Sequence, residues 1–287
     1  MLFQDTYFQS FTFWSAIEMG LYFVIVGYFF LLFFYFLFIR FRTSKKLYWL
    51  FFSVLFLCLG IGRVFFIVYY FFAPEIEYTG ATDLEVVSFL MFNYRMATFF
   101  TWIAIACAVG VLGILLFPPD TELEKTSGSL KEWFKNKNNI RILIRLVLIV
   151  IPIIIGILAL TLSDALFIDP DFMDEYPEIQ DTIEPSVVRI GGWEYPIGRM
   201  LLNFVFLPLF VAIIPFIFLY LAWKTFGVLR RSYALNAIGF FLYFTGRILQ
   251  GLFDIAEFPH LNAVMTPLII LLALLLIVIA NNYEQLR

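Results

Sequence analysis

Seven long apolar stretches constrain this chain more than any other feature of its sequence. They cover residues 11–38, 47–72, 86–117, 140–162, 197–226, 233–258 and 261–280. Each reaches the length of about 20 residues that an α-helix needs to cross the hydrocarbon core of a bilayer. None shows the strict alternation of a membrane β-barrel strand. The sequence therefore predicts an all-α polytopic membrane protein with seven transmembrane helices.

The composition agrees with a chain that lies almost wholly in lipid. Hydrophobic residues make up 62% and charged residues 14% of the 287 residues, and the mean hydropathy is +0.92. We expect a single seven-helix domain over residues 1–287, in contact with the lipid bilayer and with no nucleic-acid partner.

Basic and acidic residues lie in different connections between the apolar stretches. This distribution predicts the orientation of the chain in the membrane. The connections after the first and fifth stretches carry Arg40, Arg42, Lys45, Lys46, Lys224, Arg230 and Arg231 with no acid. The connection 163–196 instead carries nine acids against the single Arg189. Because positive residues stay in the cytoplasm, we expect the N-terminus outside the cell membrane and the C-terminus in the cytoplasm. Residues 163–196 then form an extracytoplasmic acidic loop and residues 118–139 a cytoplasmic loop.

The acidic loop contains a hairpin signal. Residues 187–190 and 193–195 suit short strands, and Gly191-Gly192 between them suits a two-residue turn. Such a hairpin either covers the mouth of the helix bundle or forms a surface loop without that role.

The sixth stretch carries a polar stripe. Tyr243, Arg247, Gln250, Asp254 and Glu257 follow one another at spacings of four, three, four and three, so a helix places them on one face. One arginine at the bilayer centre costs about 2.5–3.5 kcal/mol on insertion scales. The stripe is therefore expected to face protein, water or a ligand.

Other charged and polar residues reach the same outer level as the stripe when depth is counted at about 1.5 Å per residue. They are Glu18, Arg63, Arg95 and Arg199, while Asn203 lies one turn deeper than Arg199 and Trp102 lies deeper on the face of Arg95. In one interpretation they are paired charges that tie helices together. In the other they line an outward-open pocket for an anion. There Arg63, Arg95, Arg199 and Arg247 contact the ligand beside Gln250, Asn203, Trp102 and Tyr243, while Glu18, Asp254 and Glu257 act as structural charge partners.

The second and sixth stretches resemble each other. Arg63 follows Tyr35 by 28 residues and a basic turn, and Arg247 follows Tyr220 by 27 residues and a similar turn. This pattern suggests a parallel 3+1+3 repeat with halves 11–117 and 197–280 and a linker helix 140–162. Chance convergence of two helices is the alternative, since the third and seventh stretches match poorly.

The sequence lacks the residues that several classes of membrane protein need for their function. Every lysine lies in a cytoplasmic segment or at its edge, so none is placed to hold retinal. His260 is the single histidine, so a zinc site and a serine–histidine pair are not expected. We expect no enzyme activity, no metal and no cofactor.

The hypothesis that remains is a sensor or receptor-like membrane protein that binds a small anionic or amphipathic ligand from outside. Its output would pass to a cytoplasmic or membrane protein partner. The alternatives are a small-solute transporter built on the repeat and a structural subunit of a membrane complex.

Overall fold

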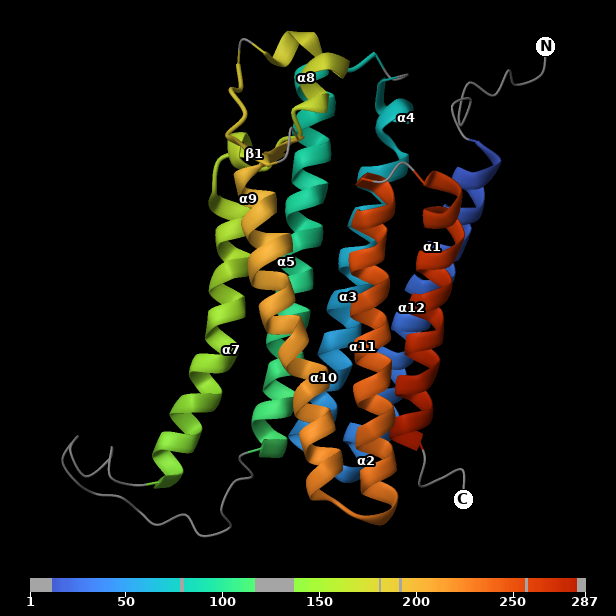
Figure 1. The fold of residues 1–287 in the computed structure, drawn as a ribbon, viewed down its shortest axis with the longest axis vertical. Coiled ribbons are helices and arrows are strands. Elements are labelled where there is room, and N and C mark those ends of the chain that lie inside the picture. The colour runs from blue at the N-terminus through green and yellow to red at the C-terminus, as the bar shows by residue number, and fades with distance from the viewer. Residues whose placement is uncertain are drawn as a thin grey trace, which may run out of the picture.

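The computed structural model describes residues 12–77, 80–116, 137–180, 182–190, 193–255 and 258–282. Long helices stand side by side in an elongated bundle (Figure 1). We call the end that holds α4 and residues 162–196 the acidic end. The opposite end, with Arg40, Arg42, Lys45 and Lys46, is called the basic end.

The first half of the chain crosses the bundle three times. Its elements are α1 (Phe13–Phe34), the π-helical η1 (Tyr35–Phe41), α2 (Arg42–Ser44), α3 (Leu47–Phe71), α4 (Ala73–Glu77) and α5 (Asp83–Leu116). Lys45, with a left-handed φ of 55°, makes the turn between α2 and α3.

The second half begins with a helix, continues through the acidic connection and ends with three further crossings. Its elements are α7 (Lys137–Thr161), η2 (Asp164–Leu166), α8 (Asp171–Glu175), η3 (Pro177–Ile179), β1 (Val187–Ile190), β2 (Trp193–Pro196), α9 (Ile197–Met200), the π-helical η4 (Leu201–Phe206), α10 (Leu207–Lys224), α11 (Gly227–Ile255) and α12 (Pro259–Asn282).

Six helices in the described part of the chain are long and apolar enough to cross a membrane. They cover Phe13–Ser44, Leu47–Phe71, Asp83–Leu116, Asn139–Thr161, Ile197–Lys224 and His260–Asn282. The prediction of an all-α polytopic membrane protein is confirmed at this level. The 29-residue α11 is long enough but less apolar, because Asn236, Arg247 and Gln250 interrupt its hydrophobic residues. A seventh span therefore stays a prediction.

Helix neighbours form a closed ring. α1 packs against α3, α3 against α5, α5 against α10, α10 against α11, α11 against α12, and α12 against α1. α7 packs on α5 from outside this ring. Small residues permit the close approach of α7, since a Cβ at Gly156 would lie 3.1 Å from Trp102 Cβ.

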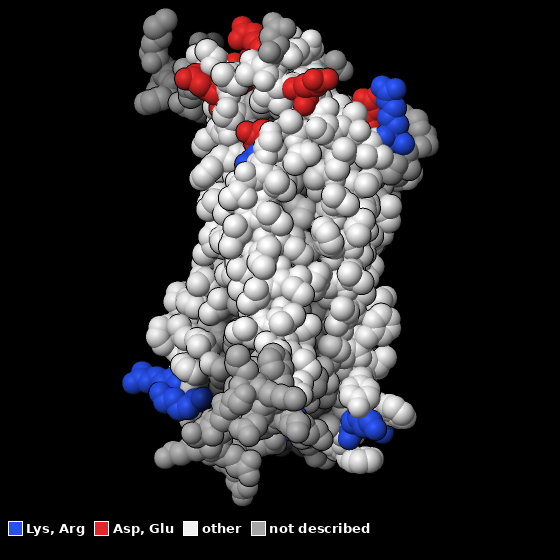
Figure 2. Space-filling view, turned by 90° about the vertical axis from the view of Figure 1, so that its left-hand side faces the viewer, with Lys and Arg blue, Asp and Glu red and all other residues white. Residues whose placement is uncertain are grey.

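The outer surface fits a membrane environment. On the face in Figure 2, a broad band without charged side chains separates an end with acidic and some basic groups from an end with Lys and Arg. Large apolar side chains such as Phe216, Leu219 and Leu268 are exposed along the helices. An exposed apolar belt of this kind is what a bilayer covers.

The ring is closed toward the basic end by packed aromatic side chains. Phe36 stacks on Trp49 at 5.3 Å and on Phe56 at 5.6 Å between ring centroids. Phe240 stacks on Phe218 at 5.5 Å from the other half of the ring. These five side chains are 0–7% exposed, so they form a dry core.

The two strands predicted for the hairpin are present, and the predicted turn at Gly191-Gly192 lies outside the described residues. β1 and β2 pair antiparallel, with Val188 opposite Tyr195 and Arg189 opposite Glu194. A backbone hydrogen bond from Ser186 N to Ala165 O (2.7 Å) ties its base to the start of the acidic connection. The connection packs on the acidic ends of α5 and α9.

Gly198 sets how closely the acidic connection approaches α9. A Cβ at this position would lie 2.6 Å from Leu166 O and 2.7 Å from the Phe167 ring. Only glycine leaves that space, so the backbone at residues 166–167 rests directly on the first turn of α9. Arg199, the next residue, is thereby brought against the same connection.

Candidate functional site

Arg63 is the most buried charged side chain at the centre of the ring. It lies on α3, sixteen residues beyond Leu47, which is about 24 Å along the helix from the basic end. Its exposure is 5%, and its guanidinium carbon lies 4.2 Å from the centroid of the Tyr22 ring on α1. Nη1 of Arg63 has no hydrogen-bond partner among the described residues.

Arg247 approaches Arg63 from α11. Its guanidinium carbon lies 5.1 Å from the centroid of the Phe66 ring, also on α3. Its Nη1 donates a long hydrogen bond of 3.4 Å to Oε1 of the buried Gln250. The positive charges of Arg247 and Arg63 repel each other. Two guanidinium groups from α3 and α11 therefore share one region of the interior.

Glu18 on α1 is an acid of the described part of the chain that interacts with Arg63. Its carboxylate lies beside the Tyr22 hydroxyl and attracts Arg63 electrostatically. Within the described side chains no ion pair reaches Arg63 or Arg247. The side chain of Asp254 and the whole of Glu257, both predicted as charge partners, lie outside the described residues. Two positive charges thus stand against one negative charge in the described part of this region.

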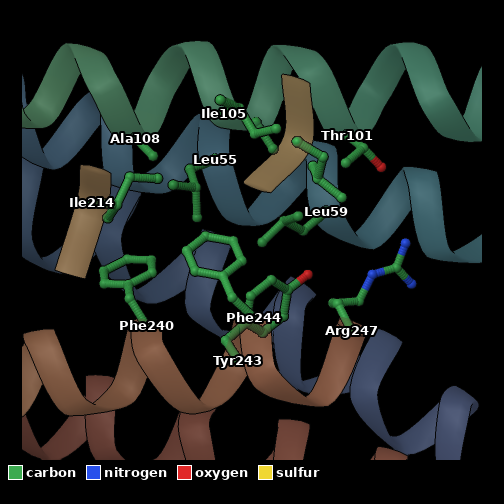
Figure 3. Close-up of a pocket in the computed structure, with 12 residues that line it drawn as sticks. Leu55, Leu59, Thr101, Ile105, Ala108, Ile214, Phe240, Tyr243, Phe244 and Arg247 are labelled. Carbon is green, nitrogen blue, oxygen red and sulfur yellow. The ribbon is translucent and has the colours of Figure 1, made fainter. Parts of the chain in front are cut away.

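A narrow, mostly apolar cavity begins beside Arg247. It encloses about 470 Å³, counting space open to its surroundings, and lies among α3, α5, α10 and α11. Figure 3 shows Arg247 and Thr101 at one end and Phe240 and Ile214 at the other. Besides Arg247, Thr101 and Tyr243, the lining residues are leucine, isoleucine, alanine and phenylalanine.

Arg95 lies apart from this cavity. Its Nη2 forms an ion pair of 2.6 Å with Asp164, and its Nη1 donates to Leu160 O at 3.0 Å. Its guanidinium also lies over the Phe167 ring, at 5.5 Å from the centroid. These contacts tie α5 to the end of α7 and to the acidic connection.

Arg199 has the same kind of role from α9. It donates to Phe167 O, to Asp169 Oδ2 at 3.2 Å and to the Tyr69 hydroxyl at 2.8 Å. The structure therefore separates the four predicted arginines into two groups. Arg63 and Arg247 lie at the centre of the ring, and Arg95 and Arg199 hold the acidic connection.

The remaining predicted site residues divide in the same way. Tyr243 lines the cavity and Gln250 binds Arg247. Trp102 is 1% exposed and packs edge-on against Phe210 at 5.8 Å, so it belongs to the core between α5 and α10. Asn203 lies in the π-helical η4 and interacts with Tyr195 of the hairpin.

Two residues of the site were not predicted from the sequence. Tyr22 and Thr101 are uncharged residues within apolar stretches. They lie on different helices from Arg63 and Arg247, so no periodic pattern in the sequence links them to these arginines. Arg145 was also missed. Its Nε and Nη2 are buried on α7 without a hydrogen-bond partner among the described residues, and its Cγ would meet a Cβ at Gly113.

Comparison with protein-family models, with curated proteins and with solved structures gave no match. The site offers two cationic groups, Arg63 with a terminal nitrogen that lacks a partner among the described residues and Arg247 at the end of an apolar cavity. This arrangement suits binding of an anion.

Proposed function

We propose that this chain is a seven-helix membrane sensor or receptor-like protein that binds a small anionic or amphipathic ligand at Arg63 and Arg247. The acidic end faces the outside, the C-terminus faces the cytoplasm, and α11 is the seventh span. The observation that carries the proposal is the buried Arg63, with a terminal nitrogen that lacks a partner among the described residues.

The energetic argument rests on charge. Burial of a guanidinium costs several kcal/mol unless it is fully paired, and here one acid, Glu18, stands against two arginines among the described residues. The second arginine adds repulsion that a low dielectric strengthens. The faces of Tyr22 and Phe66 relieve part of this cost at 4.2 and 5.1 Å. An anion between the two arginines relieves more, because each guanidinium is able to donate several charge-assisted hydrogen bonds to it.

Binding and signalling are favoured over transport by the packing below the site. The stacked rings of Phe36, Phe56, Phe218 and Phe240 separate the arginine pair from the basic end. A bound ligand would instead change how the helices that carry the two arginines pack on each other, and this change would pass to a partner protein.

Thermal unfolding of the purified protein with a panel of carboxylates, phosphates and anionic lipids tests the proposal. A ligand at about one hundred times its Kd stabilises the folded state by about 2.7 kcal/mol. For a chain of this size that corresponds to a rise of roughly 5–10 °C. The rise is expected in the wild type and is expected to disappear in Arg63→Met and Arg247→Met.

Arg95→Met is the matched control. This variant removes an arginine at a similar level that already has a protein partner, Asp164. It should lower the unfolding temperature and leave the ligand-dependent rise intact. A panel in which no compound separates the wild type from Arg247→Met would remove the basis of the proposal.

A small-solute transporter is the second candidate, and one observation favours it. The ring neighbours repeat: α1–α3–α5 and α10–α11–α12 have the same order, and α1 meets α12 as α10 meets α5. Gly62 and Gly246, each just before a central arginine, face α5 and α12 with nearest distances of 3.2 and 3.1 Å for an added Cβ. A parallel repeat gives this correspondence directly.

Uptake of labelled carboxylates and phosphates into proteoliposomes tests this candidate. Accumulation that Arg63→Met and Arg247→Met both abolish would favour transport. Saturable binding without accumulation would favour the sensor.

A further inference from the structure

We infer that the ligand of the arginine pair is a single-chain anionic amphiphile taken from the membrane, such as a fatty carboxylate or an alkyl phosphate. Its headgroup lies at Arg63 and Arg247, and its alkyl chain lies in the cavity that runs toward the basic end. This inference rests on the proposed function and names the class of ligand.

The shape of the cavity suits a long, narrow ligand. Arg247 and Thr101 stand at its acidic side, and Ala108, Ile214 and Phe240 stand at the far side (Figure 3). Seven residues separate Thr101 from Ala108 on α5 and Phe240 from Arg247 on α11. Each separation corresponds to about 10 Å along the helix axis. The cavity is therefore elongated, with its cationic group at one end.

The residues that line the cavity suit a ligand with an apolar chain. A small hydrophilic anion would fill the space beside the guanidinium groups and leave the rest of the cavity unused. The far part has no described polar side chain, since Ala104, Ala108, Ile214 and Phe240 form its walls. An alkyl chain is stabilised by each methylene that leaves water for apolar walls of this kind. Headgroup and chain together match both parts of the site.

The contact between α5 and α10 bears on where the ligand comes from. α5 and α10 contact each other more sparsely than the other neighbouring helices of the ring, and both line the cavity. On α5 the cavity-lining positions include the small residues Ala104 and Ala108. We place the path of entry for an amphiphile at this contact, because fewer interactions have to part here than between the other neighbouring helices of the ring. The membrane is the source that this path favours.

The experiment uses the full chain in nanodiscs of phosphatidylcholine, so that no single-chain detergent competes. Thermal unfolding is followed with decanoate, decyl phosphate, decanol, propionate and inorganic phosphate. Decanoate and decyl phosphate are expected to raise the unfolding temperature of the wild type by about 5 °C or more. At the same concentration propionate, inorganic phosphate and decanol are expected to have little effect. Arg247→Met should lose the rise.

Ala108→Leu tests the position of the chain, because its added atoms fill the far part of the cavity. It should reduce the effect of decanoate to that of propionate. Ala212→Leu, at an exposed position of α10, is its control and should keep the full effect. As a readout that needs no variant, decanoate with a terminal diazirine should crosslink near Ile214 or Phe240 in the wild type.

The outcomes separate the two claims. If propionate or phosphate stabilises the wild type as well as decanoate does, the anion site stands and the inference about the chain is overturned. If decanol acts as well as decanoate, or the crosslink lies elsewhere, the inference is also overturned. If no compound acts, both the inference and the proposed function fail.

Discussion

At the scale of single residues, arginines of similar sequence context have different surroundings. Arg199 donates to a carbonyl, a carboxylate and a phenol at once, whereas Arg63 keeps an unpartnered nitrogen among the described residues. Both are less than 10% exposed. What distinguishes a structural arginine from a candidate ligand-binding one is therefore the count of nearby acceptors and not the depth of burial.

Arg199→Met should destabilise the protein. It removes the donors to Phe167 O, Asp169 and Tyr69, and breaking a buried pair of this kind costs about 3 kcal/mol. That value takes the low end of the usual range because the Asp169 side chain is 31% exposed. We expect a lower unfolding temperature and faster proteolysis within residues 162–196.

Arg189→Met is the control for this change. Arg189 pairs with Glu194 on the hairpin, but its side chain is 79% exposed. Its loss should change stability by less than about 1 kcal/mol. Equal effects of the two variants would contradict the anchoring role of Arg199.

Tyr176 provides a prediction that depends on pH. Its hydroxyl donates to Glu77 Oε1 at 2.5 Å, and burial together with this carboxylate raises the pKa of Tyr176 above its ordinary value of about 10. A raised folded-state pKa gives stability that is complete below about pH 10 and is lost as the pH rises further. The difference in unfolding temperature between wild type and Tyr176→Phe should be constant from pH 7 to pH 9 and then shrink. A difference that grows above pH 10 would contradict this assignment.

At the scale of helices, glycine decides how closely α11 and α12 pack. A Cβ at Gly239 would lie 2.7 Å from Ile277 Cγ1 and 3.1 Å from Ala273 O. Since the second contact is with backbone, the two helices would have to separate. Small residues at such crossings are typical of helix packing in membranes.

Gly239→Ala and Gly251→Ala should therefore change stability in opposite directions. The first overpacks the contact with α12 and should cost about 1–3 kcal/mol. The second lies on the same helix with nothing within 4 Å of its added Cβ, so the better helix former should gain up to about 1 kcal/mol. Thermal unfolding in nanodiscs measures both. A gain of stability in both variants would show that helix propensity outweighs packing at Gly239, and a loss in both would contradict the open surroundings of Gly251.

At the scale of the whole molecule, the bundle has an acidic and a basic end separated by an uncharged band (Figure 2). Figure 1 places α11 among the other long helices, running from the basic to the acidic end. Its buried Asn236 and Gln250 face the protein interior, which lets a less apolar helix lie within a membrane bundle.

Cysteine labelling tests the orientation and the seventh span together. In a background without Cys58 and Cys107, Gln180→Cys and Phe258→Cys should react with a membrane-impermeant maleimide in intact cells. Arg230→Cys and Ser44→Cys should react only after permeabilisation. Labelling of Phe258→Cys and Arg230→Cys from the same side would contradict a spanning α11.

Much of the architecture follows from the sequence because the bilayer imposes a length and a polarity on every crossing helix. The predicted stretch 47–72 and α3 (Leu47–Phe71) differ by one residue at one end. The hairpin around Gly191-Gly192 was equally accessible, since its signal is local. The stripe on α11 was placed on one face by its spacing alone, and the structure turns Gln250 and Tyr243 of that face inward.

What only the tertiary structure decided is which charges meet. Helix periodicity fixes a face and a depth for each side chain, but it does not fix the rotation of one helix against another or the path of a long connection. Phe167 O and Asp164 reach Arg199 and Arg95 through the fold of residues 162–196, and they remove these arginines from the central site. The ring order brings Arg63 to Arg247 and opens an apolar cavity beside them, because neighbour relations between helices depend on packing across the whole bundle.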